Sequence, residues 1–336
     1  MIKFFKISFL FFIFSLMVIF SLELFARFKK PSWHISDQEI GWKLKYNFFH
    51  TYKNYDQDGN LYYSKFITNE DGLRVYGKEY SNLKILIIGD SFTADPYAGN
   101  DEMWFSHLSR EIKEYTNKDV TIYAGGGGGY STLQEFLLLK KINKKYDYNF
   151  FILQFCSNDF GSNLFEAETS GKNFNQFFKR PYLGKNEKIF FYDSFFANLF
   201  KTKLIGESRL FNKILFLFSS YKKNKPINNI NASLIEKKSI DITNILLLKI
   251  RKLVKSDNAY MVNCDNSSNG PNKYWKLIAK NNNFIPLDLP NKEIDKALKK
   301  KENIFFSDLG HFNNYGNKIY GKALFKQLKT YQNFNF

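Results

Sequence analysis

Residues 83–91 of the chain read LKILIIGDS. Leu83 to Ile88 form an apolar run rich in β-branched residues, which is typical of a strand buried on both faces of a parallel sheet. A glycine ends the run, and the polar residues Asp90 and Ser91 follow at once. The stretch therefore predicts a central strand with a polar turn at its carboxyl end.

From this strand onward, the chain alternates between buried-strand patterns and amphipathic helical patterns. The expected strands cover residues 119–124, 148–159, 259–264 and 284–289. The expected helices cover residues 102–115, 131–146, 240–256 and 274–281, and a last helix begins near Phe312. Such alternation implies a mainly parallel sheet with right-handed crossovers and helices on both faces. We therefore expect an α/β fold, a flavodoxin-like three-layer sandwich.

The N-terminal segment is the most apolar part of the chain. Ile7 to Leu22 carries no charge, and with its flanks out to Phe28 the segment approaches the roughly 20 residues that span a bilayer. We expect residues 1–30 to form a transmembrane anchor, with the rest of the chain outside the cytoplasm. No A-x-A-like cleavage site follows, but a cleaved signal peptide, and hence secretion, is the alternative.

Two further segments flank or interrupt the alternating pattern. Residues 31–82 are irregular and aromatic, and Asp58-Gly59 predicts a turn between short strands, so this part is expected to be a β-rich lead-in. Residues 83–336 form the main domain. An insertion at about 160–238 is rich in Phe, Lys and Asn, and we expect helices and loops there. The insertion is either a lid or substrate wall or a purely structural elaboration.

Composition excludes several classes of protein. With 44% hydrophobic and 19% aromatic residues, the 336-residue chain can bury a large core. The net charge of +17 comes from lysines spread along the chain, and no nucleic-acid-binding motif appears, so the charge favours anionic lipid or an acidic glycan over nucleic acid. No cofactor or metal site is expected.

The two cysteines, Cys156 and Cys264, fall near strand ends and could be neighbours, but two buried free thiols are the expectation.

Polar or glycine-rich stretches follow three of the expected strands. They are residues 89–93, 125–132 and 157–159. Ligands of such sheets bind at the carboxyl ends of the strands, so these stretches outline a site. Residues 125–129 are five consecutive glycines. The run lacks the G-K-[ST] ending of a phosphate-binding loop and the spacing of a dinucleotide fingerprint, so neither kind of site is predicted. The remaining interpretation is that the glycines bring backbone without side chains close to a reacting group.

Ser91 is the candidate nucleophile, because a sharp turn after a buried strand would expose its hydroxyl above the sheet. A serine hydroxyl needs an adjacent base. His311 is the candidate base, since it opens the last helix and stands three residues after Asp308, which can orient the imidazole and stabilise its charged form. His34 and His50 lie in the lead-in, and His107 lies inside a helix, where a packing or surface role is expected.

Acyl transfer also needs hydrogen-bond donors for a developing oxyanion. The side-chain amide of Asn158 is one candidate, at the end of the third strand. A backbone N–H of the glycine run is another. Either feature alone is also typical of an ordinary turn, so the case for an active site depends on all of these residues meeting at one edge of the sheet.

Taken in order, the blocks GDS, a glycine turn, SND and DLGH resemble the SGNH (GDSL-like) hydrolase superfamily over about residues 83–330. The resemblance implies Ser91 as nucleophile, His311 as base and Asp308 as its partner. It also implies an oxyanion hole formed by the Ser91 N–H, the Gly129 N–H and the Asn158 amide, with Gly126 as the next candidate glycine. The lead-in is similar to that of membrane-anchored bacterial members.

The sequence departs from the family pattern at two positions. Cys156 stands where the third block usually begins with glycine, and Ala124 stands where the second block often has asparagine. Neither position supplies a group that takes part in the chemistry.

Three functions follow from this reading. The first is a membrane-anchored serine esterase that acts on an acylated small molecule or glycan, with O-acetyl groups of cell-surface polysaccharide as the expected substrate. The second is an O-acyltransferase that uses the same residues and a sugar hydroxyl as acceptor. The third is a non-catalytic glycan-binding protein. The oligomeric state is not indicated by the sequence.

Overall fold

The computed structural model describes most of the chain. The described residues are 2–29, 31–78, 80–94, 96–170, 179–192, 208–211, 214, 232–265, 270–307 and 310–331. Asp308 therefore lies outside the described residues, as does most of the expected insertion.

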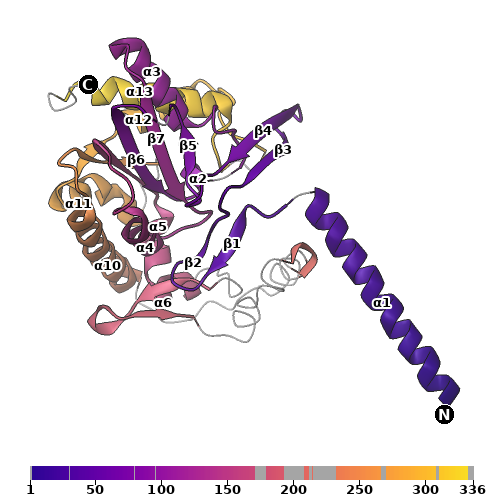
Figure 1. The fold of residues 1–336 in the computed structure, drawn as a ribbon. Coiled ribbons are helices and arrows are strands. Elements are labelled where there is room, and N and C mark those ends of the chain that lie inside the picture. The colour runs from indigo at the N-terminus through magenta and orange to yellow at the C-terminus, as the bar shows by residue number, and fades with distance from the viewer. Residues whose placement is uncertain are drawn as a thin grey trace.

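The centre of the molecule is a six-stranded sheet with the order β12-β11-β8-β6-β7-β5 (Figure 1). Its strands are β5 (Arg74–Tyr76), β6 (Leu83–Gly89), β7 (Val120–Gly126), β8 (Phe150–Phe155), β11 (Ala259–Asn263) and β12 (Ile285–Leu287). All neighbours pair in parallel except β5, which runs antiparallel to β7. The expected mainly parallel sheet is confirmed, and β6, the strand predicted from residues 83–88, lies in its interior between β8 and β7.

Helices cover both faces of this sheet. One face carries α3 (Trp104–Thr116), α12 (Leu289–Lys299) and α13 (Asn314–Leu328), and the other carries α4 (Thr132–Ile142), α10 (Ala232–Leu253) and α11 (Trp275–Asn281) (Figure 1). Side chains of β6 alternate between the two layers: Ile85 and Ile87 belong to the first core, and Leu86 and Ile88 to the second. The three-layer sandwich is thus confirmed.

Shorter elements complete the main domain. They are α2 (Ser91–Ala94), α5 (Asn158–Asn163), α6 (Phe165–Ser170), two 3-10 turns (Lys185–Glu187 and Gly270–Tyr274), β9 (Pro181–Leu183) and β10 (Ile189–Phe191). β9 and β10 pair as an antiparallel hairpin. The insertion was expected to hold only helices and loops, so this hairpin is a difference, as is α12, which no sequence pattern had predicted.

The lead-in consists mainly of two antiparallel pairs. β1 (His34–Asp37) pairs with β2 (Gly41–Leu44), and β3 (Phe49–Tyr55) pairs with β4 (Leu61–Ile67). The predicted turn at Asp58-Gly59 joins β3 to β4, and Gly59 has a φ of +80°, which favours glycine. β5 then enters the main sheet, so the lead-in and the main domain share one sheet.

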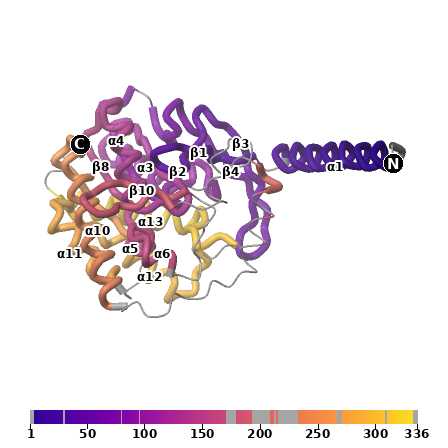
Figure 2. Tube along the Cα trace, turned by 90° about the horizontal axis from the view of Figure 1, so that it is seen from below, coloured from indigo at the N-terminus to yellow at the C-terminus, as the bar shows by residue number. Residues whose placement is uncertain are grey.

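The N-terminal helix α1 (Ile2–Lys29) projects away from the rest of the molecule over most of its length (Figures 1 and 2), and near its carboxyl end Glu23 accepts hydrogen bonds from residues 208–210. Its segment Phe4–Phe28 is long and apolar enough to cross a membrane, and none of its most apolar window is buried against the protein. Length and composition of this kind are shared by membrane anchors and signal sequences.

Cys156 and Cys264 form a disulfide, so the expectation of two free thiols was wrong. The parallel register of β8 and β11 pairs Phe155 with Asn263, which places the next residue of each strand side by side. Their Cα atoms are 5.2 Å apart, within the range that a disulfide bridges. Sequence position alone had located both cysteines at strand ends but not on neighbouring strands.

Candidate active site

Three loops meet at the carboxyl edge of the sheet. The register pairs Gly89 at the end of β6 with Gly126 of β7 on one side and with Gln154 of β8 on the other. The polar stretches that follow these strands are therefore neighbours, as the sequence predicted. At Gly126 the approach is so close that a Cβ would lie 2.3 Å from the carbonyl oxygen of Gly89, which only glycine permits.

Ser91 is the first residue of α2, directly after the turn at the end of β6. The turn is held by Asp90, whose carboxylate accepts the Phe92 N–H at 2.9 Å and whose carbonyl accepts the N–H groups of Thr93 and Ala94. This strand–turn–helix geometry leaves Ser91 half-buried at the edge of the site.

His311 comes from the other end of the domain and lies beside this turn. Its ring centroid is 5.2 Å from that of Phe92 and 5.2 Å from that of Tyr97, with the Tyr97 ring nearly parallel at 21°. The backbone carbonyl of His311 accepts the Phe306 N–H at 2.9 Å. The imidazole ring thus packs against the rings of Phe92 and Tyr97, and the hydrogen bond from Phe306 holds the His311 main chain.

Ser91 and His311 line the same small cavity. The other lining residues are Phe92, Tyr97, Ala98, Met103, Phe306, Phe312 and Asn317. The structure therefore brings together the predicted nucleophile and the predicted base. Their expected partner Asp308 lies outside the described residues.

The carboxyl group of Asp90 lies within electrostatic reach of His311. Burial raises the pKa of the Asp90 carboxyl to about 6, and the His311 charge and a hydrogen bond from Gln154 act in the opposite direction. The carboxyl group of Asp265 raises the pKa further. A buried acid that titrates near neutral pH next to the candidate base was not expected from the sequence.

The glycine run ends in a tight turn. The N–H of Tyr130 donates to the carbonyl of Gly127 at 3.1 Å, and Gly129 has a φ of +67°. A positive φ at the third residue of a four-residue turn is the mark of a type II turn, and it favours glycine there. Gly129 is therefore required by the turn itself, whatever its part in catalysis.

Asn158 opens α5 at the end of β8, and its side chain is exposed. The residue after it, Asp159, is fully buried and accepts the backbone N–H of Cys156 at 3.3 Å, which fixes the start of α5. Gly129 and Asn158 thus stand on either side of Ser91, after β7 and β8. Neither is among the residues that line the cavity shared by Ser91 and His311.

Asp265 is a residue of this edge that sequence reasoning missed. It follows β11, and its carboxylate accepts both the N–H of Ser157 at 3.0 Å and the Ser157 hydroxyl at 2.5 Å. It also accepts the Asn272 amide at 3.0 Å. The strand-end rule that selected Ser91 could have selected Asp265, because it too follows directly on a buried strand.

The remaining histidines do not contribute to the cavity. His107 is buried in α3 beside Arg110, which matches the packing role expected for it. His34 is half-buried in β1, and His50 belongs to the β3–β4 hairpin. Among the described residues, no group of three or more His, Cys, Asp or Glu side chains is arranged to hold a metal ion.

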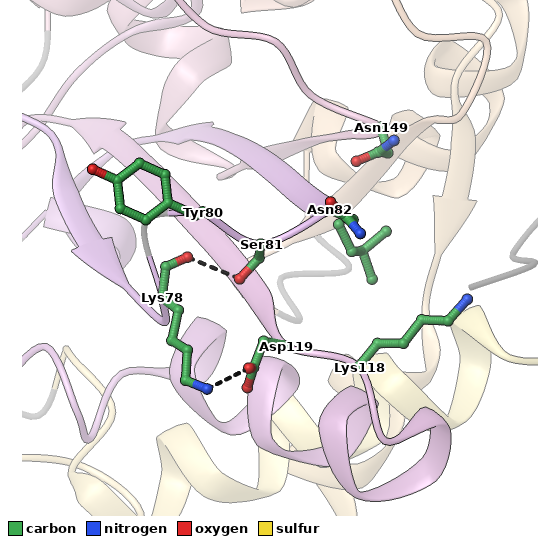
Figure 3. Close-up of a pocket in the computed structure, with 8 residues that line it drawn as sticks. Lys78, Tyr80, Ser81, Asn82, Lys118, Asp119 and Asn149 are labelled. Carbon is green, nitrogen blue, oxygen red and sulfur yellow. Dashed lines mark hydrogen bonds and ion pairs between the residues drawn. The ribbon is translucent and has the colours of Figure 1, made fainter.

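A separate groove lies at the opposite, amino-terminal edge of the sheet (Figure 3). It has a volume of about 520 Å³. Figure 3 shows Lys78 paired with Asp119 at 2.6 Å and the Ser81 hydroxyl donating to the Lys78 carbonyl at 2.8 Å. Lys78, Ser81 and Asp119 are thus engaged with one another, and no histidine lines the groove. The carboxyl edge is therefore the candidate active site.

No protein-family model and no curated protein matches the sequence. The chain is similar to solved structures of low sequence identity. The lipase/acylhydrolase from Enterococcus faecalis shares 14% identity with a TM-score of 0.41, over 74% of this chain and 96% of that one. A member of the lipolytic protein G-D-S-L family from Veillonella parvula DSM 2008 shares 13% with a TM-score of 0.38, over 73% and 97%. Axe2, an acetylxylan esterase from Geobacillus stearothermophilus, shares 12% with a TM-score of 0.39, over 74% and 94%. At these identities the similarity is one of fold.

Proposed function

We propose that the protein is a membrane-anchored serine esterase of the SGNH type. One observation carries this proposal: Ser91, at the end of β6, and His311, just before α13, line the same cavity. The order of the blocks along the sequence supports it, as does their position at the carboxyl edge of a parallel sheet.

In the proposed reaction, the Ser91 hydroxyl oxygen attacks the ester carbonyl carbon while His311 takes the hydroxyl proton. Asp308 orients the imidazole and stabilises its charged form. The oxyanion of the tetrahedral intermediate accepts hydrogen bonds from the N–H groups of Ser91 and Gly129 and from the Asn158 amide. The ester C–O bond then breaks, and the alcohol leaves with the proton from His311. Water, activated by the same imidazole, hydrolyses the acyl-enzyme.

The proposed substrate is an O-acetyl ester on a cell-surface polysaccharide. The cavity shared by Ser91 and His311 has a volume of about 10 Å³, and its walls are mainly aromatic and apolar. A space of that size holds at most one water molecule, so its walls must move apart to admit an acyl group, and a short one such as acetyl needs the least movement. The apolar helix α1 supports a location at the membrane, and the esterase domain is proposed to lie outside the cytoplasm.

A serine-reactive fluorophosphonate tests the proposal. The full-length protein in detergent should be labelled once, at Ser91, and Ser91→Ala should abolish labelling. Ser256→Ala is the matched control, because Ser256 is a half-buried serine at the amino-terminal edge that, within the described ranges, bonds the Asn149 carbonyl and the Asn258 N–H and no other group. Absence of labelling, or labelling that survives Ser91→Ala, would overturn the proposed function.

An activated acetyl ester then separates hydrolysis from transfer. The proposal expects free acetate as the product whether or not an oligosaccharide is present. Acetylated oligosaccharide among the products would instead identify an O-acyltransferase that uses the same residues. Labelling without turnover of any ester, together with oligosaccharide binding, would identify a glycan-binding protein.

A further inference from the structure

A four-residue turn with the glycines of residues 127–130 can adopt either of two backbone conformations, type I or type II. Types I and II differ by a rotation of about 180° of the central peptide, here the one between Gly128 and Gly129. That rotation reverses the direction of the Gly129 N–H. Glycine accepts either sign of φ, so the sequence of the turn does not by itself choose between the two forms.

The choice is made by a contact from the lead-in. Trp42 of β2 is buried, and its indole N–H donates to the carbonyl of Gly128 at 3.1 Å. This bond holds the oxygen of the central peptide in the type II orientation. The peptide is trans, so the Gly129 N–H points the opposite way from that oxygen, away from the indole.

Neighbouring contacts hold Trp42 and the turn together. The Tyr130 hydroxyl donates to the carbonyl of Trp42 at 2.6 Å, and the two rings meet edge to face at 5.9 Å. Arg180, from the segment before β9, lies 5.2 Å from the centroid of the Trp42 ring and donates to the carbonyl of Gly129 at 2.7 Å. The carbonyl oxygens of Gly128 and Gly129 are therefore held by Trp42 and Arg180, and these two side chains pack against each other.

We infer that Trp42 is a positioning residue of the active site: its indole N–H fixes the Gly128–Gly129 peptide and thereby aims the Gly129 N–H at the oxyanion. The inference rests on the proposed function, in which Gly129 is an oxyanion donor. It gives the lead-in a part in the chemistry, since a strand distant in sequence sets the direction of a donor on the catalytic domain.

The variant Trp42→Phe removes the indole N–H and keeps an aromatic ring. With the donor gone, the turn populates both orientations, and only one of them presents the Gly129 N–H. We expect kcat for an acetyl ester to fall about tenfold, while KM changes less than about twofold, because the donor acts on the transition state rather than on the bound ester. The rate of phosphonate labelling at Ser91 should fall by the same factor.

A second variant separates positioning from packing. Replacing Trp42 with 3-benzothienylalanine, in which sulfur takes the place of the N–H, preserves the shape of the ring. It should reproduce the loss in kcat and leave the melting temperature unchanged. Trp275→Phe is the matched control: it truncates another buried tryptophan, on α11, and should lower the melting temperature but leave kcat within about twofold.

The outcomes distinguish this inference from the proposed function. A wild-type protein that phosphonate does not label would overturn both. A labelled, active wild type with an unchanged kcat in the benzothienyl variant would overturn the role of Trp42 alone. A loss in Trp42→Phe that the benzothienyl variant restores would also contradict it, since shape rather than the N–H would then be responsible.

Discussion

Asp90 shows how the placement of one residue sets a pH dependence. Its folded-state pKa is about 6, against a usual value of 3.8, because the carboxyl is buried. The folded state therefore holds the proton more tightly, and Asp90 reduces stability progressively as the pH rises from about 4 to about 6. The full cost above pH 6 is on the order of 3 kcal/mol.

Asp90→Asn removes this ionisation while keeping an oxygen that can accept the Phe92 N–H. The free energy of unfolding of the variant, relative to wild type, should be higher at pH 8 than at pH 4 by roughly 3 kcal/mol. Urea denaturation at the two pH values measures the difference. Asp147→Asn is the control, because it makes the same substitution at a side chain that is 96% exposed. An equal effect of Asp90→Asn at both pH values would contradict a raised pKa.

Asn158 provides a test of the oxyanion hole at a single side chain. If its amide donates to the oxyanion, Asn158→Ala should lower kcat by about 10²–10³ with the fold intact. Asn149→Ala is the matched control, because Asn149 is an exposed asparagine that precedes β8 as Asn158 follows it. A loss below about threefold would mean that Asn158 is only a turn residue.

At the scale of elements, the disulfide joins the residues that follow β8 and β11. Cys156 and Cys264 are 108 residues apart, so the cross-link closes a long loop in the unfolded chain. Reduction should lower the free energy of unfolding by about 2–5 kcal/mol. The double variant Cys156→Ser, Cys264→Ser should be equally destabilised and insensitive to reductant. Two titratable thiols in the untreated, unfolded protein would refute the pairing.

The buried strands β6, β7, β8, β11 and β12 were predictable because each is an apolar run between polar ends, and the βα alternation then predicted a mainly parallel sheet, although it did not predict the order of the strands. Helix α12 was not predicted, because Pro290 suggests a break in the chain. Proline is in fact favoured in the first turn of a helix, and Pro290 lies there. The antiparallel strand β5 was not predicted, because it is three residues long and its side chains show no regular alternation of polar and apolar residues. Short elements carry too few residues for a period to be recognised.

The candidate site was predictable to a similar degree and for a related reason. Ser91 and His311 each stand next to a regular element, so the position of that element fixed theirs. Trp42 could not be found, because its bond to Gly128 spans 86 residues and depends on how an irregular lead-in folds back onto the domain. The same holds for Arg180, whose contacts come from within the insertion.

At the scale of the whole molecule, α1 is either retained as a membrane anchor or cleaved as a signal peptide. The folded domain uses a residue of this helix: the Glu23 carboxylate accepts the N–H groups of Arg209 and Leu210 and the Ser208 hydroxyl, each at 2.9 Å. Arg27 also pairs with Glu23 at 2.6 Å. Cleavage of α1 would remove the three bonds from residues 208–210 to Glu23, and we therefore expect α1 to be retained as an anchor.

A retained anchor predicts where the protein is found and how long it is. After expression in a bacterial host, the protein should stay in the membrane pellet through alkaline carbonate washing, because the roughly 20 apolar residues of α1 span the bilayer. Intact-mass measurement should show a chain that still includes residues 1–30. A variant with an A-x-A cleavage site inserted before Pro31 is the control and should release the domain into the soluble fraction. A wild-type chain recovered in that fraction with its N-terminus near residue 31 would show instead that α1 is a signal peptide.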